Sequence, residues 1–179
     1  MPAPASGPRP GVRTVVPVPT GDDGPATWTD DLRTRLDELL DGYRASLHDS
    51  LDGLTEDEAR LRLVPSKTTL LGLLKHVTYV EGVWFDQAVS GRSTADIGIA
   101  GSPDRSFTLT RADTIESVRA AHRERCEASR RTMAALSLDA TVTGRGGHAV
   151  WALHLQVLRE LAQHAGHADV LREQVLARR

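Results

Sequence analysis

The fold is decided by a largely apolar stretch at residues 67–90, which reads KTTLLGLLKHVTYVEGVWFDQAVS. Its leucines and valines recur at intervals of three and four residues, and Trp84 and Phe85 widen the apolar surface. A helix that is apolar over most of its surface is buried inside a protein. The stretch therefore predicts a helix in the interior of a helix bundle.

Apolar residues at helical spacing continue on both sides of this stretch. A connection at 92–109, which holds Gly, Ser, Pro and Asp, and a glycine-rich turn at 143–147 separate the later helices. The predicted long helices cover residues 30–51, 67–90, about 110–136 and 148–177. Because the sequence has four long helices and few strand signals, we expect an all-α fold, a four-helix bundle with a long crossover connection.

The N-terminal residues differ in composition from the rest of the chain. Residues 1–28 contain seven of the nine prolines, so they cannot hold a helix. We expect a flexible or extended tail at 1–28 and the helix bundle at 29–179. A length of 179 residues suits one sizeable core, which favours a single domain.

Charge and hydropathy exclude several classes of protein. The 22 basic and 24 acidic residues are mixed along the sequence, so no basic block predicts binding to nucleic acid or to a lipid surface. No apolar run approaches the about 18 to 20 residues that span a bilayer, and the single cysteine, Cys126, cannot form an intrachain disulfide. Since no secretory signal is recognisable, we expect a cytoplasmic protein.

His76 differs from most of the seven histidines in the character of its neighbours. Leu73, Val80 and Val83 lie three, four and seven positions away, which places its imidazole on an apolar, inward-facing stripe. A buried imidazole needs polar partners. His48 and His122, by contrast, lie among charged residues, where a solvated helix face accounts for them.

Partners for His76 are available on the last predicted helix. Glu160 and His164 are four residues apart, so their Cβ atoms lie about 5–6 Å apart on one inward-facing side, a spacing that allows both to bind one metal ion. A Glu160–His164 pair that also bonds His76 without any metal explains the same spacing, and the sequence leaves both interpretations open. His167 shares the face of His164 and could act as an alternative ligand, as a group supporting a ligand, or as a proton carrier.

Two motifs together resemble a known family. Residues 53–56 and 63–85, followed by 154–173 with the run HAGHADVLRE, are similar to the DinB superfamily, and specifically to its DUF664 branch. The resemblance extends from about Asp30 to Gln174. It implies a four-helix bundle of DinB type.

The resemblance also implies a ligand set. In the superfamily, one histidine of the second helix and a pair at i, i+4 on the last long helix hold a divalent metal; here these positions are His76, Glu160 and His164. Many relatives have histidine at the position of Glu160, but the mycothiol-dependent maleylpyruvate isomerases use glutamate, so the resemblance favours Glu160 over His167 as a ligand. His167 remains as the candidate catalytic residue.

The activity implied by the resemblance is a metal-dependent transfer of a low-molecular-weight thiol such as mycothiol. A divalent cation, Zn²⁺ first and Ni²⁺ or Fe²⁺ as alternatives, activates the thiol as a metal-bound thiolate toward a small electrophile. A homodimer is also implied by the superfamily. Two other interpretations are a non-catalytic metal-binding stress-response protein and a non-haem iron oxygenase that uses the same three residues.

Overall fold

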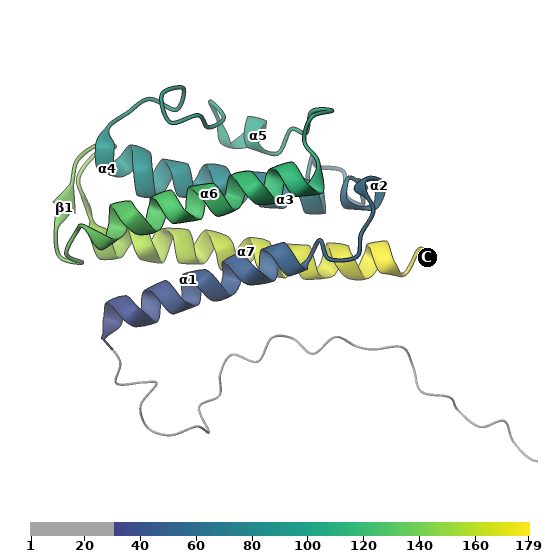
Figure 1. Ribbon diagram of the computed structural model, residues 1–179, viewed down its shortest axis with the longest axis horizontal. Helices are drawn as coiled ribbons and strands as arrows, with labels where there is room; N and C mark the ends of the chain where they lie inside the picture. The colour runs from purple at the N-terminus through teal and green to yellow at the C-terminus, as the bar shows by residue number, and fades with distance from the viewer. Residues whose placement is uncertain (1–30) are drawn as a thin grey trace, which may run out of the picture. The chain divides into compact units, whose positions relative to one another are not determined.

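The chain is described here by a computed structural model, which covers residues 31–179. This part is mostly helical, as expected, and holds one two-stranded hairpin (Figure 1). The predicted tail at 1–28 lies outside the described residues. The elements are α1 Leu32–Asp49, α2 Glu56–Ala59, α3 Leu70–Glu81, the π-helical η1 Gly82–Gln87, α4 Ala88–Ser90, α5 Pro103–Ser106, α6 Ile115–Ala134, β1 Thr141–Val142, β2 His148–Ala149 and α7 Val150–Leu176.

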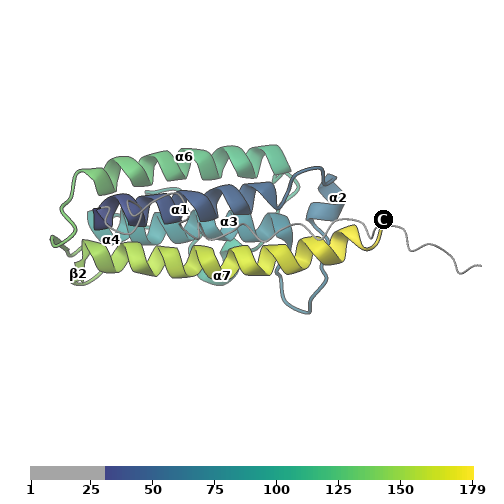
Figure 2. The same cartoon turned by 90° about the horizontal axis from the view of Figure 1, so that it is seen from below.

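The long helical segments α1, α3–η1–α4, α6 and α7 lie lengthwise side by side (Figures 1 and 2). α1 and α7 run in one direction, whereas the continuous segment α3–η1–α4 and α6 run in the other, and residues 91–114 return the chain along the length of the molecule. α1 packs mainly on α7, and α3 packs on both α6 and α7. Since α3 has two long neighbours, the apolar stretch at 67–90 supplies the inner helix that its sequence predicts. No helix within residues 31–179 is long and apolar enough to cross a bilayer.

The helix expected over 67–90 differs from α3 at its start and in its middle. Thr69, in an extended conformation, caps α3 by accepting a hydrogen bond from the backbone N–H of Gly72 at 3.0 Å, so the helix begins at Leu70 rather than beside Ser66. Its ladder widens into the π-helical turn η1, which the apolar periodicity did not predict. The helical segment ends where predicted, at Gly91, whose φ of 73° suits glycine.

The glycine-rich turn at 143–147 connects the antiparallel strands β1 and β2. The backbone N–H of Gly144 donates to the carbonyl of Ala88 at 2.9 Å, so the turn docks against the end of α4. A Cβ atom at Gly144 would collide with the backbone of α4 and Gly91. Because β2 takes residues 148 and 149, the last long helix begins at Val150, two residues later than predicted.

A buried ion pair connects α1 to α3 inside the apolar core. Glu81 is fully buried, and both of its carboxylate oxygens accept hydrogen bonds from Arg44, at 2.7 and 2.9 Å. Burial alone would raise the pKa of Glu81, but the adjacent Arg44 guanidinium outweighs burial and the pKa of this carboxyl is lowered. The pair is therefore charged, and each partner depends on the other for its burial.

This dependence predicts the effect of breaking the pair. Glu81→Gln removes the buried counter-charge of Arg44 and leaves it only its ion pair with the exposed Asp41, so the variant should lower the free energy of unfolding by about 3 kcal/mol in urea denaturation. Glu127→Gln, which removes an exposed partner of Arg130, is the matched control and should cost less than about 1 kcal/mol. Equal costs for the two variants would show that Arg44 and Glu81 contribute no more than a surface pair.

Candidate metal centre

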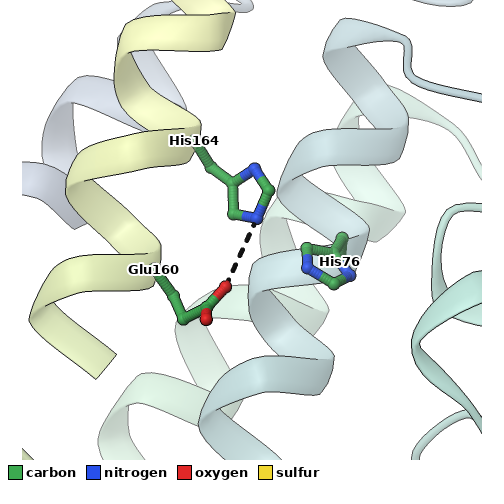
Figure 3. Close-up of side chains that lie close together, drawn as sticks. All are labelled: His76, Glu160 and His164. Carbon is green, nitrogen blue, oxygen red and sulfur yellow. Dashed lines mark ion pairs between the residues drawn. The ribbon is translucent and has the colours of Figure 1, made fainter. Parts of the chain in front are cut away.

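Three polar side chains converge where α3 faces α7 (Figure 3). His76 comes from α3, and Glu160 and His164 come from successive turns of α7. One donor atom from each residue lies within 4.8 Å of the donor atoms of the other two. The structure thus brings together the three residues that the sequence and the resemblance selected.

The surroundings of the three residues are apolar. On α7, Val157 and Leu161 are fully buried beside Glu160 and His164, so the helix presents this face to the core. On α3, His76 is 6% exposed within a helix whose neighbouring leucines and valines are buried. Packing of these apolar residues fixes the helices at the distance that lets the polar groups meet.

His76 is held in one orientation by the segment that follows α4. Its Nδ1 lies 2.7 Å from the Ser106 hydroxyl, and its ring stacks on Phe107 with centroids 3.9 Å apart. The Ser106 hydroxyl uses its one hydrogen to donate a hydrogen bond to the carbonyl of Pro103, so it accepts a hydrogen bond from the Nδ1–H of His76. This arrangement puts the proton on Nδ1 and leaves the lone pair of Nε2 free to bind a metal.

Glu160 is held through only one of its carboxylate oxygens. Oε1 accepts hydrogen bonds from Gln156 at 3.1 Å and from Arg159 at 2.7 Å. Oε2 faces Nε2 of His164 at 3.6 Å, which is longer than a hydrogen bond. One oxygen is therefore fixed and the other is available for a ligand.

His164 lacks the hydrogen bonds that a buried imidazole normally makes. It is 8% exposed, its Nδ1 is buried without a partner among residues 31–179, and its Nε2 is 3.6 Å from the Glu160 carboxylate. A buried polar group without partners costs free energy. In the metal-free Glu160–His164 pair that the sequence left open, Nε2 of His164 is too far from the carboxylate for a hydrogen bond, so this nitrogen is available to a metal.

Both imidazoles are in the protonation state that metal binding requires. The pKa of His76 is lowered to about 4, mainly by burial and to a smaller extent by the nearby His164. Burial lowers the pKa of His164 more than Glu160 raises it. Two neutral imidazoles and one carboxylate form the donor set of a tetrahedral site with an open position.

The structure places His167 outside this group of donors. Its side chain is exposed on α7, and its ring centroid lies 5.6 Å from that of His164. It is therefore adjacent to the site on the solvent side.

The interpretation of His122 as a residue of a solvated face is wrong. His122 is fully buried, and its Nδ1 lies 2.9 Å from Nε2 of His48, which is half-buried. Glu81, His122 and Cys126 form a second group of possible metal donors. The charged residues near His122 in the sequence therefore gave a misleading signal.

The second group is less suited to a metal than the first. Both oxygens of Glu81 are occupied by Arg44, whose positive charge opposes a cation. Burial, together with the Glu81 charge, raises the pKa of the Cys126 thiol well above its ordinary value, so the thiol stays protonated. The group of Glu81, His122 and Cys126 is therefore a polar network within the core.

Comparison with protein-family models gave a match over most of the chain. A family model described as mycothiol-S-transferase matches residues 35–177, a range that contains His76, Glu160 and His164. The match agrees with the resemblance to DinB-type proteins that use mycothiol. No curated protein and no solved structure matches the chain.

The Ser106 contact predicts the tautomer of His76. In metal-free protein labelled with ¹⁵N on histidine, we expect His76 to show a protonated Nδ1 and a bare Nε2 near pH 7. Ser106→Ala removes the acceptor and should produce a mixture of tautomers, while Ser129→Ala, which removes a buried hydroxyl from α6, should not. Protonation of Nε2 in the unmodified chain would contradict the assignment.

Burial of His122 predicts a dependence of stability on pH. Burial lowers its pKa to about 4 from 6.5, despite the attraction of Glu81. Between pH 7.5 and 5.5 the unfolded chain gains a proton at this residue and the folded chain does not, so stability should fall as the pH falls. Metal-free wild type should lose about 1 kcal/mol more than His122→Gln across this range in urea denaturation. Equal losses in the two proteins would rule out a neutral His122.

Proposed function

The chain belongs to the mycothiol S-transferase family, and we propose that it transfers a low-molecular-weight thiol to a small electrophile at a divalent metal bound by His76, Glu160 and His164. Mycothiol or a close analogue is the proposed cosubstrate. The observation that carries the proposal is the convergence of two neutral imidazoles and one free carboxylate oxygen at the contact between α3 and α7.

The donor set supports Zn²⁺ as the metal. Zn²⁺ accepts two imidazoles and a carboxylate and keeps a position open for substrate, although Ni²⁺ and Fe²⁺ accept the same ligands. The bound cation supplies positive charge that lowers the pKa of a thiol placed at the open position, so that the thiolate becomes the nucleophile. Glu160 provides the negative charge that offsets the cation.

The remaining steps are assigned to residues around the site. Ser106 and Phe107 keep His76 in one tautomer and one orientation. His167 is exposed beside His164, a position from which it can carry the thiol proton to solvent. Cys126 is buried in the second group of polar residues, which supports the assignment of the reacting sulfur to the cosubstrate.

Two further predictions, the DinB type of the bundle and the homodimer, rest on the resemblance. The lengthwise packing of α1, α3, α6 and α7, with 91–114 as the crossover, supports a four-helix bundle of DinB type. The homodimer stays a prediction that rests on the resemblance alone.

The ligand assignment predicts metal content. Wild type should bind one Zn²⁺ per chain by elemental analysis, His76→Ala and His164→Ala should bind almost none, and Glu160→Gln should lower the affinity at least about tenfold because it removes the offsetting charge. Glu160→His should retain the metal, and so should His167→Ala. Unchanged affinity in Glu160→Gln together with metal loss in His167→Ala would replace Glu160 by His167 in the ligand set.

The proposed reaction predicts metal-dependent consumption of thiol. Zn²⁺-loaded wild type should consume mycothiol with a chlorinated bimane faster than the spontaneous reaction, as followed by fluorescence of the thioether. Removal of the metal by a chelator, or His164→Ala, should return the rate to the spontaneous value. If loaded wild type shows no acceleration with a panel of thiols and small electrophiles, the protein binds metal without catalysing this transfer.

A further inference from the structure

A pocket of about 380 Å³ lies next to the candidate metal centre, between the segment after α2 and the segment after α5. Its lining includes three basic side chains, Arg60, Arg62 and Lys67, and the ring of Phe107. Phe107 also stacks on His76, with ring centroids 3.9 Å apart. One aromatic side chain is therefore shared between the pocket and the metal centre.

The positive charge of this pocket is not balanced by the protein. Within residues 31–179, Arg60 and Arg62 donate hydrogen bonds to backbone carbonyls and form no ion pair with a carboxylate. Lys67 pairs with the exposed Asp104. The pocket has three basic side chains, and only one of them is paired with a carboxylate. Two positive charges therefore remain on a concave surface, which favours a negatively charged ligand.

Both arginines are held in place by backbone carbonyls. Nη2 of Arg60 donates to the carbonyl of Thr110 at 3.0 Å, and Nη2 of Arg62 donates to the carbonyls of Pro65 and Ser66 at 3.2 and 3.1 Å. In each guanidinium these bonds use only one nitrogen and leave the others able to donate. A guanidinium fixed in this way is suited to a planar carboxylate, which accepts two parallel hydrogen bonds.

From this charge and geometry we infer that the pocket binds the carboxylate of a small organic acid, and that the protein selects electrophiles that carry such a group. Arg60 and Arg62 bind the carboxylate, and Phe107 contacts the apolar body of the molecule beside the metal centre. This inference rests on the proposed function and deepens it, because it names the chemical class of the electrophile.

Two chloronitroaromatic probes distinguish recognition of the acid group from the transfer reaction itself. The acidic probe is 4-chloro-3-nitrobenzoate and the neutral one is 1-chloro-2,4-dinitrobenzene, each with mycothiol and Zn²⁺-loaded protein. In both reactions a carbon–sulfur bond forms, the carbon–chlorine bond breaks, and chloride and the thiol proton are released, with no net oxidation or reduction. The measured quantity is the preference ratio, kcat/KM for the acidic probe divided by kcat/KM for the neutral probe.

Arg62→Gln is the test variant, because Arg62 binds only carbonyls of its own loop. It should lower the preference ratio about tenfold, the effect of losing one charged hydrogen-bond partner. Arg111→Gln removes an exposed arginine that does not line the pocket, and this control should keep the wild-type ratio. A ratio that is the same in wild type, Arg62→Gln and Arg111→Gln would overturn the inference while leaving the proposed transfer intact.

A binding measurement covers the case in which neither probe reacts, which would count against the proposed function itself. Calorimetric titration with 4-chloro-3-nitrobenzoate, without thiol, should show binding to wild type that weakens with added salt and weakens about tenfold in Arg62→Gln. Arg60→Lys, which keeps the charge but loses the fork of donors, should bind with intermediate affinity. No binding to wild type, or equal binding to Arg62→Gln, would overturn the assignment of a carboxylate site.

Discussion

The contact between α3 and α7 is the interaction on which the candidate site depends. Apolar residues along both helices bury this contact, and His76, Glu160 and His164 are the polar groups placed within it. Polar groups in such a position need partners, and His164 has too few among the described residues, because its Nδ1 has none and its Nε2 lies 3.6 Å from Glu160. A cation would give Nε2 of both imidazoles and the second oxygen of Glu160 a common partner, which is why we propose a metal centre here.

The same inner helix carries a second polar cluster with the opposite property. Glu81 lies five residues after His76, but its carboxylate is fully satisfied by Arg44, and the neighbouring Cys126 thiol stays protonated. That cluster is balanced in charge without any ligand and contributes to the packing of α1, α3 and α6. The contrast between the two clusters supports the proposal that His76, Glu160 and His164 form the functional one.

The sequence predicted the parts of the site that depend on spacing along one helix. Glu160 and His164 are linked by the i, i+4 rule, and His76 was identified by its apolar neighbours. Contacts of Ser106 and of His122 could not be predicted, because they depend on where the crossover segment and α6 lie against other helices.

The helix boundaries were likewise predicted only in part from the sequence. The helix predicted over 67–90 ends before Gly91, as expected, whereas its start was placed three residues before Leu70, because Thr69 and not an earlier residue caps it. Glu81, a charged residue in this largely apolar stretch, was a usable signal for a buried partner, although nothing in the sequence identified that partner as Arg44.

X-ray absorption spectroscopy at the zinc edge, on Zn²⁺-loaded protein free of added thiol, is the most direct test of a metal held by His76, Glu160 and His164. Such a centre should show nitrogen and oxygen ligands at about 2.0–2.2 Å, outer-shell scattering from two imidazoles, and no sulfur. A sulfur ligand at about 2.3 Å would place the metal at Cys126 in the second cluster and would contradict the assignment of His76, Glu160 and His164.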